Sequence, residues 1–184
     1  MLITDSKIEQ PMHHWLEQVV IGLNLCPFAS GPHLQKRVRI ITSDCTEQAC
    51  LLADLSAELE NMAEHSPKEL ETSLIAVPNL LHDFGDYNQF LDLVDKLLVE
   101  QGWQGHFQVA SFHPNYQFAG TQPDDTENLT NRSPYPVLHI IREASLEQAL
   151  KHYPNPEQIP QTNIKTVAHL SPEQKASLFP YLLK

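Results

Sequence analysis

The fold of this chain is constrained most by the order in which helix-like and strand-like hydrophobic patterns follow one another. Apolar residues at three- and four-residue spacing indicate amphipathic helices, and short runs rich in β-branched residues indicate strands. Strand patterns cover residues 38–42, 73–77, 107–112, 137–142 and, more weakly, 163–167. Helical patterns start near residues 12, 46, 86, 145 and 172, which gives the order α-βα-βαββαβ-α.

This order predicts an α+β protein with a ferredoxin-like βαββαβ core. An extra N-terminal helix and one βα unit would precede that core, and helices would pack against a mixed sheet. The strands at 73–77 and 107–112 would be parallel, joined by the helix at 86–101 as a right-handed crossover. A three-layer open sheet is the alternative. A length of 184 residues predicts one globular domain, 1–184.

Capping signals predict where several helices begin and end. The segment Asp44–Glu47 resembles a capping box at the start of the second helix, and Asp86 opens the third. Gly102 is well placed to end that third helix. The last helix should begin at Ser171, with Gln174 completing its capping box.

The charge balance argues against polyanionic partners. The chain has 12 basic and 23 acidic residues, a net charge of −11, and no dense basic stripe that could release counterions from nucleic acid. The same charge disfavours an anionic membrane surface. The N-terminus lacks the apolar stretch of a signal peptide, and no run approaches 18 apolar residues. We therefore expect a cytoplasmic protein, with an oligomeric state that the sequence does not specify.

The three cysteines are Cys26, Cys45 and Cys50, an odd number without metal-like spacing. Together with the missing signal peptide they predict free thiols in a reducing compartment. Cys45 and Cys50 fall on the second predicted helix, about 140° apart, and are interpreted as packing residues. No metal site is predicted from them.

The connection from His113 to Tyr135 is the most site-like segment. It is more than twenty residues long without helical or strand periodicity, and loops of that length are usually functional or disordered. The aromatic residues Tyr116, Phe118 and Tyr135 favour an ordered, packed loop. A strand hidden inside the segment is the alternative.

His113 and Cys26 are the candidate catalytic residues. His113 would lie at the carboxyl end of a strand, where many sheet-based sites lie, and imidazole suits acid–base chemistry near neutral pH. Cys26 could act as a nucleophile with His113 as its base. The alternatives are a locally hydrogen-bonded histidine and a buried structural cysteine, because Cys26 follows a helix end among apolar neighbours.

Candidate substrate-binding residues cluster in the same loop. A guanidinium can bind a carboxylate or phosphate through two parallel hydrogen bonds, so Arg132 is the expected anchor for a small anionic molecule. The alternative is that Arg132 neutralises Asp124 and Asp125 and holds the loop closed. The candidates are Arg132, Asn131, Ser133, Tyr116, Asp124 and Asp125.

These residues predict a small enzyme of hydrolase or transferase type that acts on a small anionic molecule. The alternative is a non-catalytic small-molecule-binding or regulatory module. A third hypothesis is a metal-dependent enzyme that uses His113, His139 and an aspartate, although no ligand-spaced motif supports it. The glycines are scattered singly, so no phosphate loop or dinucleotide fingerprint is present and no cofactor is assigned.

Four sequence blocks resemble the signature of an uncharacterised, mainly bacterial family that is catalogued as a domain of unknown function. The blocks are Leu23–Ala29, Asp83–Asn88, Ser111–Phe118 and Thr130–Pro136. The resemblance extends over nearly the whole chain and implies a single-domain protein of this size. It brings no activity, cofactor or catalytic residue with it.

Overall fold

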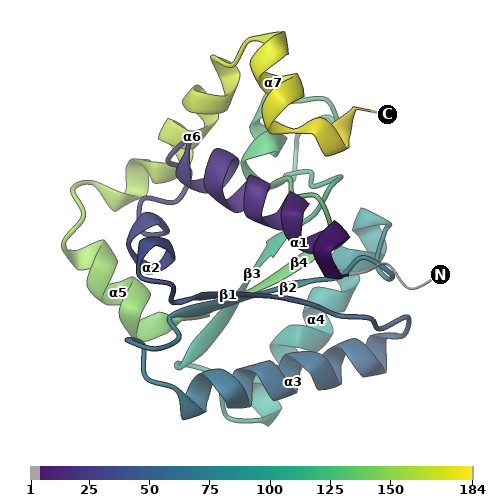
Figure 1. Cartoon of the computed structure of the whole chain (residues 1–184), viewed down its shortest axis with the longest axis vertical. Helices are drawn as coiled ribbons and strands as arrows, with labels where there is room; N and C mark the ends of the chain where they lie inside the picture. The colour runs from purple at the N-terminus through teal and green to yellow at the C-terminus, as the bar shows by residue number, and fades with distance from the viewer. Residues whose placement is uncertain (1–4, 184) are drawn as a thin grey trace.

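A four-stranded mixed sheet forms the centre of the molecule (Figure 1). The computed structural model describes residues 5–183, with the side chains of residues 7–183. The sheet has the order β1-β2-β4-β3, in which β1 and β2 are parallel and β4 is antiparallel to both β2 and β3. The strands are β1 (Val38–Thr42), β2 (Thr72–Ala76), β3 (Phe107–Phe112) and β4 (Val137–Arg142).

Helices cover both faces of this sheet. Figure 1 shows α3 and α4 on one side and α1 with α6 and α7 on the other. The helices are α1 (Asp5–His14), α2 (Ser30–Leu34), α3 (Gln48–Glu64), α4 (Phe84–Glu100), α5 (Glu143–Lys151), α6 (Ile159–Ala168) and α7 (Pro172–Leu178). A π-helical turn, Trp15–Ile21, continues α1, and 3-10 turns lie at Thr126–Asn131, Pro156–Gln158 and Pro180–Leu182. Among the described helices, none combines the length and apolar composition needed to cross a membrane.

Strand β2 explains why both faces of the sheet are buried. Leu74 and Ala76 pack into the cluster formed with α1 and the C-terminal helices. Ile75 and Val77 pack into the opposite cluster, under α3 and α4. A strand that is buried on both faces has a continuous run of apolar residues instead of alternating apolar and polar ones. Residues 74–77 form such a run. The result is an α+β protein with three layers, which is the layering of the alternative prediction.

The predicted strand at 163–167 is wrong. These residues belong to α6, and Val167 is fully buried against the α1 side of the sheet. The edge position beside β2 is instead occupied by β1, which is parallel to it. The mixed α+β class is therefore confirmed, whereas the ferredoxin-like topology is not. The strands β2 and β3 are parallel to each other as predicted, with β4 between them.

The capping predictions had mixed outcomes. Ser171 and Gln174 form the predicted capping box, and Gly102 lies just beyond α4 with a φ of 75°. Helix α4 begins earlier than predicted because Asp83 caps it, accepting a hydrogen bond from the backbone N–H of Asp86. The predicted capping box at residues 44–47 is wrong: α3 starts at Gln48 and receives no side-chain cap.

Candidate functional site

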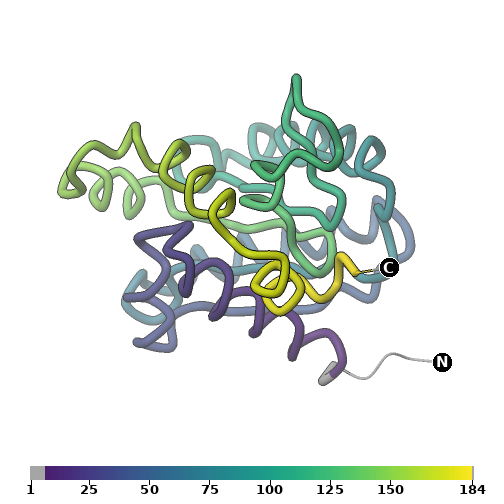
Figure 2. The backbone as a smooth tube through the Cα atoms, turned by 90° about the horizontal axis from the view of Figure 1, so that it is seen from above, coloured from purple at the N-terminus to yellow at the C-terminus, as the bar shows by residue number. Residues whose placement is uncertain are grey.

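The long connection between β3 and β4 is an ordered loop, held from inside by a buried asparagine. Asn128 is fully buried, and its Oδ1 accepts hydrogen bonds from the backbone of Phe118 and the hydroxyl of Thr121, each at 3.0 Å. Its Nδ2 donates to the carbonyl of Gln122 at 2.8 Å. Figure 2 shows this loop, in green, standing out from the rest of the backbone. Asn128 was not predicted, because nothing in the sequence distinguishes it from the other polar loop residues.

His113 is fully buried at the end of β3, and both of its ring nitrogens are hydrogen-bonded to backbone. Nε2 lies 3.0 Å from the carbonyl of Leu81, and Nδ1 accepts from the N–H of Asn115 at 2.9 Å. This pairing fits the neutral tautomer with the proton on Nε2. Burial lowers the pKa of His113, which also favours the neutral ring. The geometry is that of a structural histidine, and the predicted acid–base role stays a prediction.

Aromatic rings pack around His113. The ring centroids of Phe84 and Tyr87 lie 5.4 and 5.1 Å from its imidazole. Tyr116 packs against Phe84 at 5.0 Å and against Phe118 at the same distance. Tyr116 therefore has a structural role, because its ring helps to anchor the loop to α4. Its predicted contact with a substrate stays a prediction.

Arg132 links the loop to the terminal helices. Its Nε donates to the carbonyl of Tyr116 at 3.3 Å, and its Nη2 donates to the carbonyl of Pro123. Its own carbonyl accepts from Trp15 Nε1 at 3.0 Å and from the hydroxyl of Tyr181 at 3.2 Å. Burial lowers the pKa of Arg132, and the charge of Asp124 opposes that shift.

The other predicted binding residues also make local contacts. Asn131 donates from Nδ2 to the carbonyl of Ser111 at 3.4 Å, and the fully buried Ser133 donates to the carbonyl of Tyr135. Asp125 accepts a hydrogen bond from the backbone of Gln122 at 2.7 Å, as residues that form turns do. In the part of the chain that the structure describes, neither Asp125 nor Asp124 forms an ion pair with Arg132. Direct neutralisation of the acid pair by Arg132 is therefore not what the geometry shows.

Cys26 is a free, partly buried thiol whose pKa is raised by burial. The backbone N–H groups of Phe28 and Ala29 oppose that shift. None of the hydrogen bonds or aromatic contacts between described residues joins Cys26 to His113 or Arg132. The predicted Cys26–His113 pair is not brought together by such a contact.

His139, the second histidine of the metal hypothesis, bonds within the sheet. Its Nε2 lies 2.7 Å from the hydroxyl of Thr72, and burial lowers its pKa to about 4. Nε2 of His139 already has a partner, as do both ring nitrogens of His113. The His113–His139 metal hypothesis gains no support from this geometry.

Cys45 and Cys50 form a disulfide, so the prediction that they are free packing thiols is wrong. Their Cα atoms lie 5.7 Å apart, within the range that a disulfide spans. Cys45 lies in the loop after β1, and only Cys50 lies on α3. The two cysteines do not share a helix, because α3 begins at Gln48.

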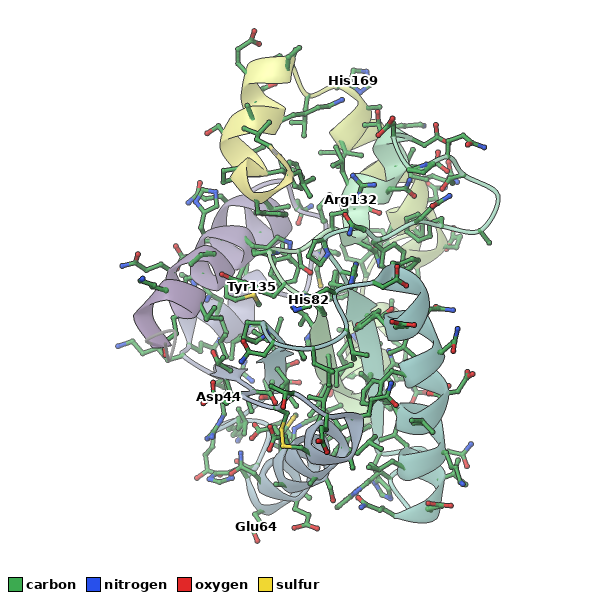
Figure 3. All side chains as sticks on the ribbon, turned by 90° about the vertical axis from the view of Figure 1, so that its right-hand side faces the viewer. Asp44, Glu64, His82, Arg132, Tyr135 and His169 are labelled. Atoms are coloured by element: carbon green, nitrogen blue, oxygen red, sulfur yellow. A yellow bond between two sulfur atoms is a disulfide. The ribbon has the colours of Figure 1, made fainter. Side chains whose placement is uncertain are left out.

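The disulfide lines an open cavity of about 510 Å³ at the carboxyl end of β1. The lining residues are Thr42, Asp44, Cys45, Thr46, Glu47, Cys50 and Asp54. The two sulfur-bearing residues differ in environment: Cys45 is 5% exposed, whereas Cys50 is exposed in the first turn of α3. Figure 3 shows the disulfide, in yellow, near Asp44 and well separated from Arg132.

Asp54 and Ser43 hold the buried end of this disulfide. Asp54 Oδ2 lies 3.3 Å from Cys45 Sγ and accepts a hydrogen bond from Ser43 Oγ at 2.6 Å. Ser43 Oγ in turn accepts from the N–H of Cys45 at 3.3 Å. A disulfide sulfur carries no proton, so the contact between Cys45 Sγ and Asp54 becomes a hydrogen bond only when the disulfide is reduced.

The arrangement around the disulfide is suited to thiol chemistry. The N-terminus of the 17-residue helix α3 stabilises negative charge on Cys50 Sγ in the reduced form. Asp54 lies beside the other sulfur, where it can accept the S–H hydrogen bond of Cys45. A signal for this site was present in the sequence: the two cysteines lie on either side of a strand-to-helix junction.

One family model matches the chain over residues 7–177, and its description is a protein of unknown function, DUF1415. No curated protein matches the chain. No solved structure matches it either. The predicted resemblance to an uncharacterised family is confirmed.

Proposed function

The chain belongs to this family of unknown function, and we propose that it is a redox protein whose Cys45–Cys50 disulfide exchanges with thiols. One observation carries the proposal: the disulfide lines an open cavity with Cys50 exposed and Cys45 buried beside Asp54. Exposed disulfides are the labile, catalytic or regulatory ones, whereas structural disulfides resist reduction. A cytoplasmic location is part of this proposal, because disulfides in a reducing compartment are transient and catalytic or redox-sensing.

The exchange proceeds in two balanced steps. A thiolate from solution attacks the exposed Cys50 Sγ, the S–S bond breaks, and Cys45 leaves as a thiolate. Cys45 then takes a proton from water and donates it as a hydrogen bond to Asp54, which lies 3.3 Å away. A second thiolate attacks the mixed disulfide at the sulfur of the first thiol and releases Cys50 as a thiolate, which takes the second proton from water. The protein gains two electrons and two protons, and two thiols become one disulfide.

The fold does not depend on this disulfide for its core. The two cysteines are separated by only 5 positions, and closing so short a loop stabilises a protein by about 2 kcal/mol. Cys45 is one member of the hydrophobic cluster under α3 and α4, but other buried members of that cluster, such as Leu59, Phe90 and Ile140, come from α3, α4 and β4. The cluster on the other face of the sheet contains neither cysteine. Reduction should therefore leave the native structure in place, as a reversible redox couple requires.

Trapping of mixed disulfides tests which sulfur is attacked. Cys45→Ser and Cys50→Ser leave one thiol each at the site, and both are made in a Cys26→Ser background. The chain with Cys50 alone should react with oxidised glutathione at least about 10-fold faster than the chain with Cys45 alone, because Cys45 is buried. Rates are read from the mass of the adduct. Equal rates, or faster reaction at Cys45, would contradict the proposed asymmetry.

A second candidate function is the binding of a small anionic molecule at Arg132, by an enzyme of hydrolase or transferase type or by a non-catalytic module. The observation in its favour is that Arg132 forms no ion pair with any described residue. An external carboxylate or phosphate could therefore pair with this guanidinium, in competition with the charge of Asp124 and the two carbonyls that it already binds. The acidic cavity at the disulfide, lined by Asp44, Glu47 and Asp54, would repel the same ligand.

A panel of small phosphates and carboxylates, screened by melting shift, tests the second candidate. An anion that binds Arg132 should raise the melting temperature of the wild type and lose that effect in Arg132→Lys, because an ammonium cannot reproduce the guanidinium fork. The mutant's own melting temperature is the control for its fold. If no anion raises the melting temperature of the wild type, Arg132 is a structural residue whose role is to donate hydrogen bonds to the carbonyls of Tyr116 and Pro123.

We also propose that the unit β2-α4-β3 with β4 is of the ferredoxin-like, split βαβ type. Its support is that β4 pairs antiparallel with both β2 and β3 and so lies between two parallel strands.

A further inference from the structure

We propose that the reduced form of the Cys45–Cys50 pair binds a zinc ion, with Asp54 as the third protein ligand. The inference rests on the reduction of the disulfide that the proposed function requires. Cys45, Cys50 and Asp54 each offer one ligand atom, and these atoms all lie within 4.8 Å of one another. They come from two segments, the loop after β1 and the first two turns of α3, which the disulfide already holds together.

The donor set fits a thiophilic divalent cation. Two thiolates and one carboxylate are ligands that Zn²⁺ accepts in proteins, and three protein ligands leave one coordination position open. The open cavity in front of the pair would give water or a small ligand access to that position. Hard cations such as Mg²⁺ prefer an all-oxygen environment, which this cluster does not offer.

Charge around the cavity also favours a cation. Asp44 and Glu47 line the same cavity as the three ligands. Two thiolates beside Asp54 would add further negative charge in the reduced form, and a divalent cation compensates for it. Among the residues that the structure describes, no lysine or arginine lines this cavity to compete with the ion.

Ser43 positions two of the three ligands. It is 2% exposed, donates to Asp54 Oδ2 at 2.6 Å and accepts from the backbone N–H of Cys45 at 3.3 Å. Residues that hold metal ligands in place in this way typically contribute about 10- to 100-fold to metal affinity. Ser43 is therefore a positioning residue for the ion as well as for the disulfide.

Binding and oxidation exclude each other. A reductant of the thiol or phosphine class first gives two electrons to the disulfide and is itself oxidised. The ion then displaces one proton from each thiol, forms two metal–sulfur bonds and remains divalent. An oxidised pair has no thiolate to offer, so the redox state of Cys45 and Cys50 would control the occupancy of the site.

The test uses the full chain, reduced with a phosphine and freed of reductant without oxygen. Zn²⁺ alone is titrated against a chromophoric chelator, and Co²⁺ is titrated separately to record thiolate-to-cobalt absorption. We expect one ion for each reduced chain, no binding by the oxidised chain, and a higher melting temperature of the reduced chain with Zn²⁺. Cys50→Ser should weaken binding by more than about 100-fold, and Ser43→Ala by about 10-fold. Cys26→Ser, the matched control, should bind as the wild type does.

Three results would each overturn the zinc site. They are a reduced chain that binds no zinc, undiminished binding in Cys50→Ser, and equal binding by the oxidised chain. Because the phosphine reduces the disulfide directly, the titration does not depend on exchange with thiols. Zinc binding without thiol exchange would contradict the proposed function and support the zinc site. Thiol exchange without zinc binding would support the proposed function and contradict the zinc site.

Discussion

His139 is a histidine whose protonation the fold opposes. Its Nε2 faces the hydroxyl of Thr72 at 2.7 Å, and that hydroxyl donates to the carbonyl of Ile140 at 2.6 Å. The threonine oxygen must therefore accept from His139, which fixes the proton on Nε2. Burial lowers the pKa of His139 to about 4, so the ring stays neutral in the folded protein until the solution is markedly acidic.

This histidine should make stability depend on pH below neutrality. The pKa is depressed in the folded state, so between about 6.5 and about 4 the unfolded chain binds a proton that the folded chain does not. Stability is complete above that window and is lost as the pH falls through it, by at most about 3 kcal/mol at its lower end. Urea unfolding at pH 7 and pH 4.5 measures the loss. His139→Gln should lose less stability over that interval than the wild type, and an identical loss in both would contradict the assignment.

At the level of elements, the N-terminal helix is shaped by a π-helical turn. Helix α1 contains Pro11, and the turn Trp15–Ile21 follows it directly. Backbone bonds from Gly22 to Glu17 and from Leu25 to Val20 span five residues each, as in a π-helix. These wide turns bring the backbone carbonyl of Gln18 close to the Cα of Gly22, so that a Cβ there would lie 2.4 Å from the oxygen.

The crowding at Gly22 predicts a difference between two glycine substitutions. Gly22→Ala should cost about 1–3 kcal/mol, because the Cβ would meet backbone atoms rather than a flexible side chain. Gly31→Ala, in α2, should be neutral or slightly stabilising, because nothing lies within 4 Å of its Cβ and alanine is the better helix former. Free energies of unfolding for both variants decide the matter. Equal values would mean that the π-turn relaxes without cost.

Helices and strands with a strong hydrophobic periodicity could be predicted from the sequence, but the residues at which they begin and end could not. Helix α4 was predicted because Phe90 and Val94 repeat at helical spacing, and both are buried. Residues 163–167 were mistaken for a strand because Ile164 and Val167 suit either conformation, and only packing against the α1 side decides.

The candidate site was missed for the same reason. The start of α3 was predicted three to four residues too early, which placed Cys45 on the helix. The two cysteines were therefore interpreted as separate packing residues, whereas they form a disulfide. The long loop is ordered, as predicted, but the partners of its side chains were not predicted. His113 and Arg132 donate hydrogen bonds to backbone carbonyls, those of Leu81, Tyr116 and Pro123. Such backbone partners cannot be recognised from a sequence pattern.

For the whole molecule, two regions of different character lie apart from each other (Figure 3). The loop after β3 and the terminal helices are joined through the carbonyl of Arg132, which accepts from Trp15 and Tyr181. The disulfide and its cavity lie at the junction of β1 and α3, away from that contact (Figure 3). A change in the redox state of Cys45 and Cys50 should therefore alter the cavity without disturbing the packing around the long loop.

A redox titration of the full chain tests the central claim most directly. The protein is equilibrated in glutathione buffers of graded potential, its thiols are trapped by alkylation and counted by mass, and circular dichroism follows the fold. We predict one reversible two-electron transition of Cys45 and Cys50, with a midpoint above about −300 mV and an unchanged dichroism spectrum. A disulfide that is reduced only after denaturant unfolds the chain would contradict the account, and so would two cysteines that stay reduced at every potential.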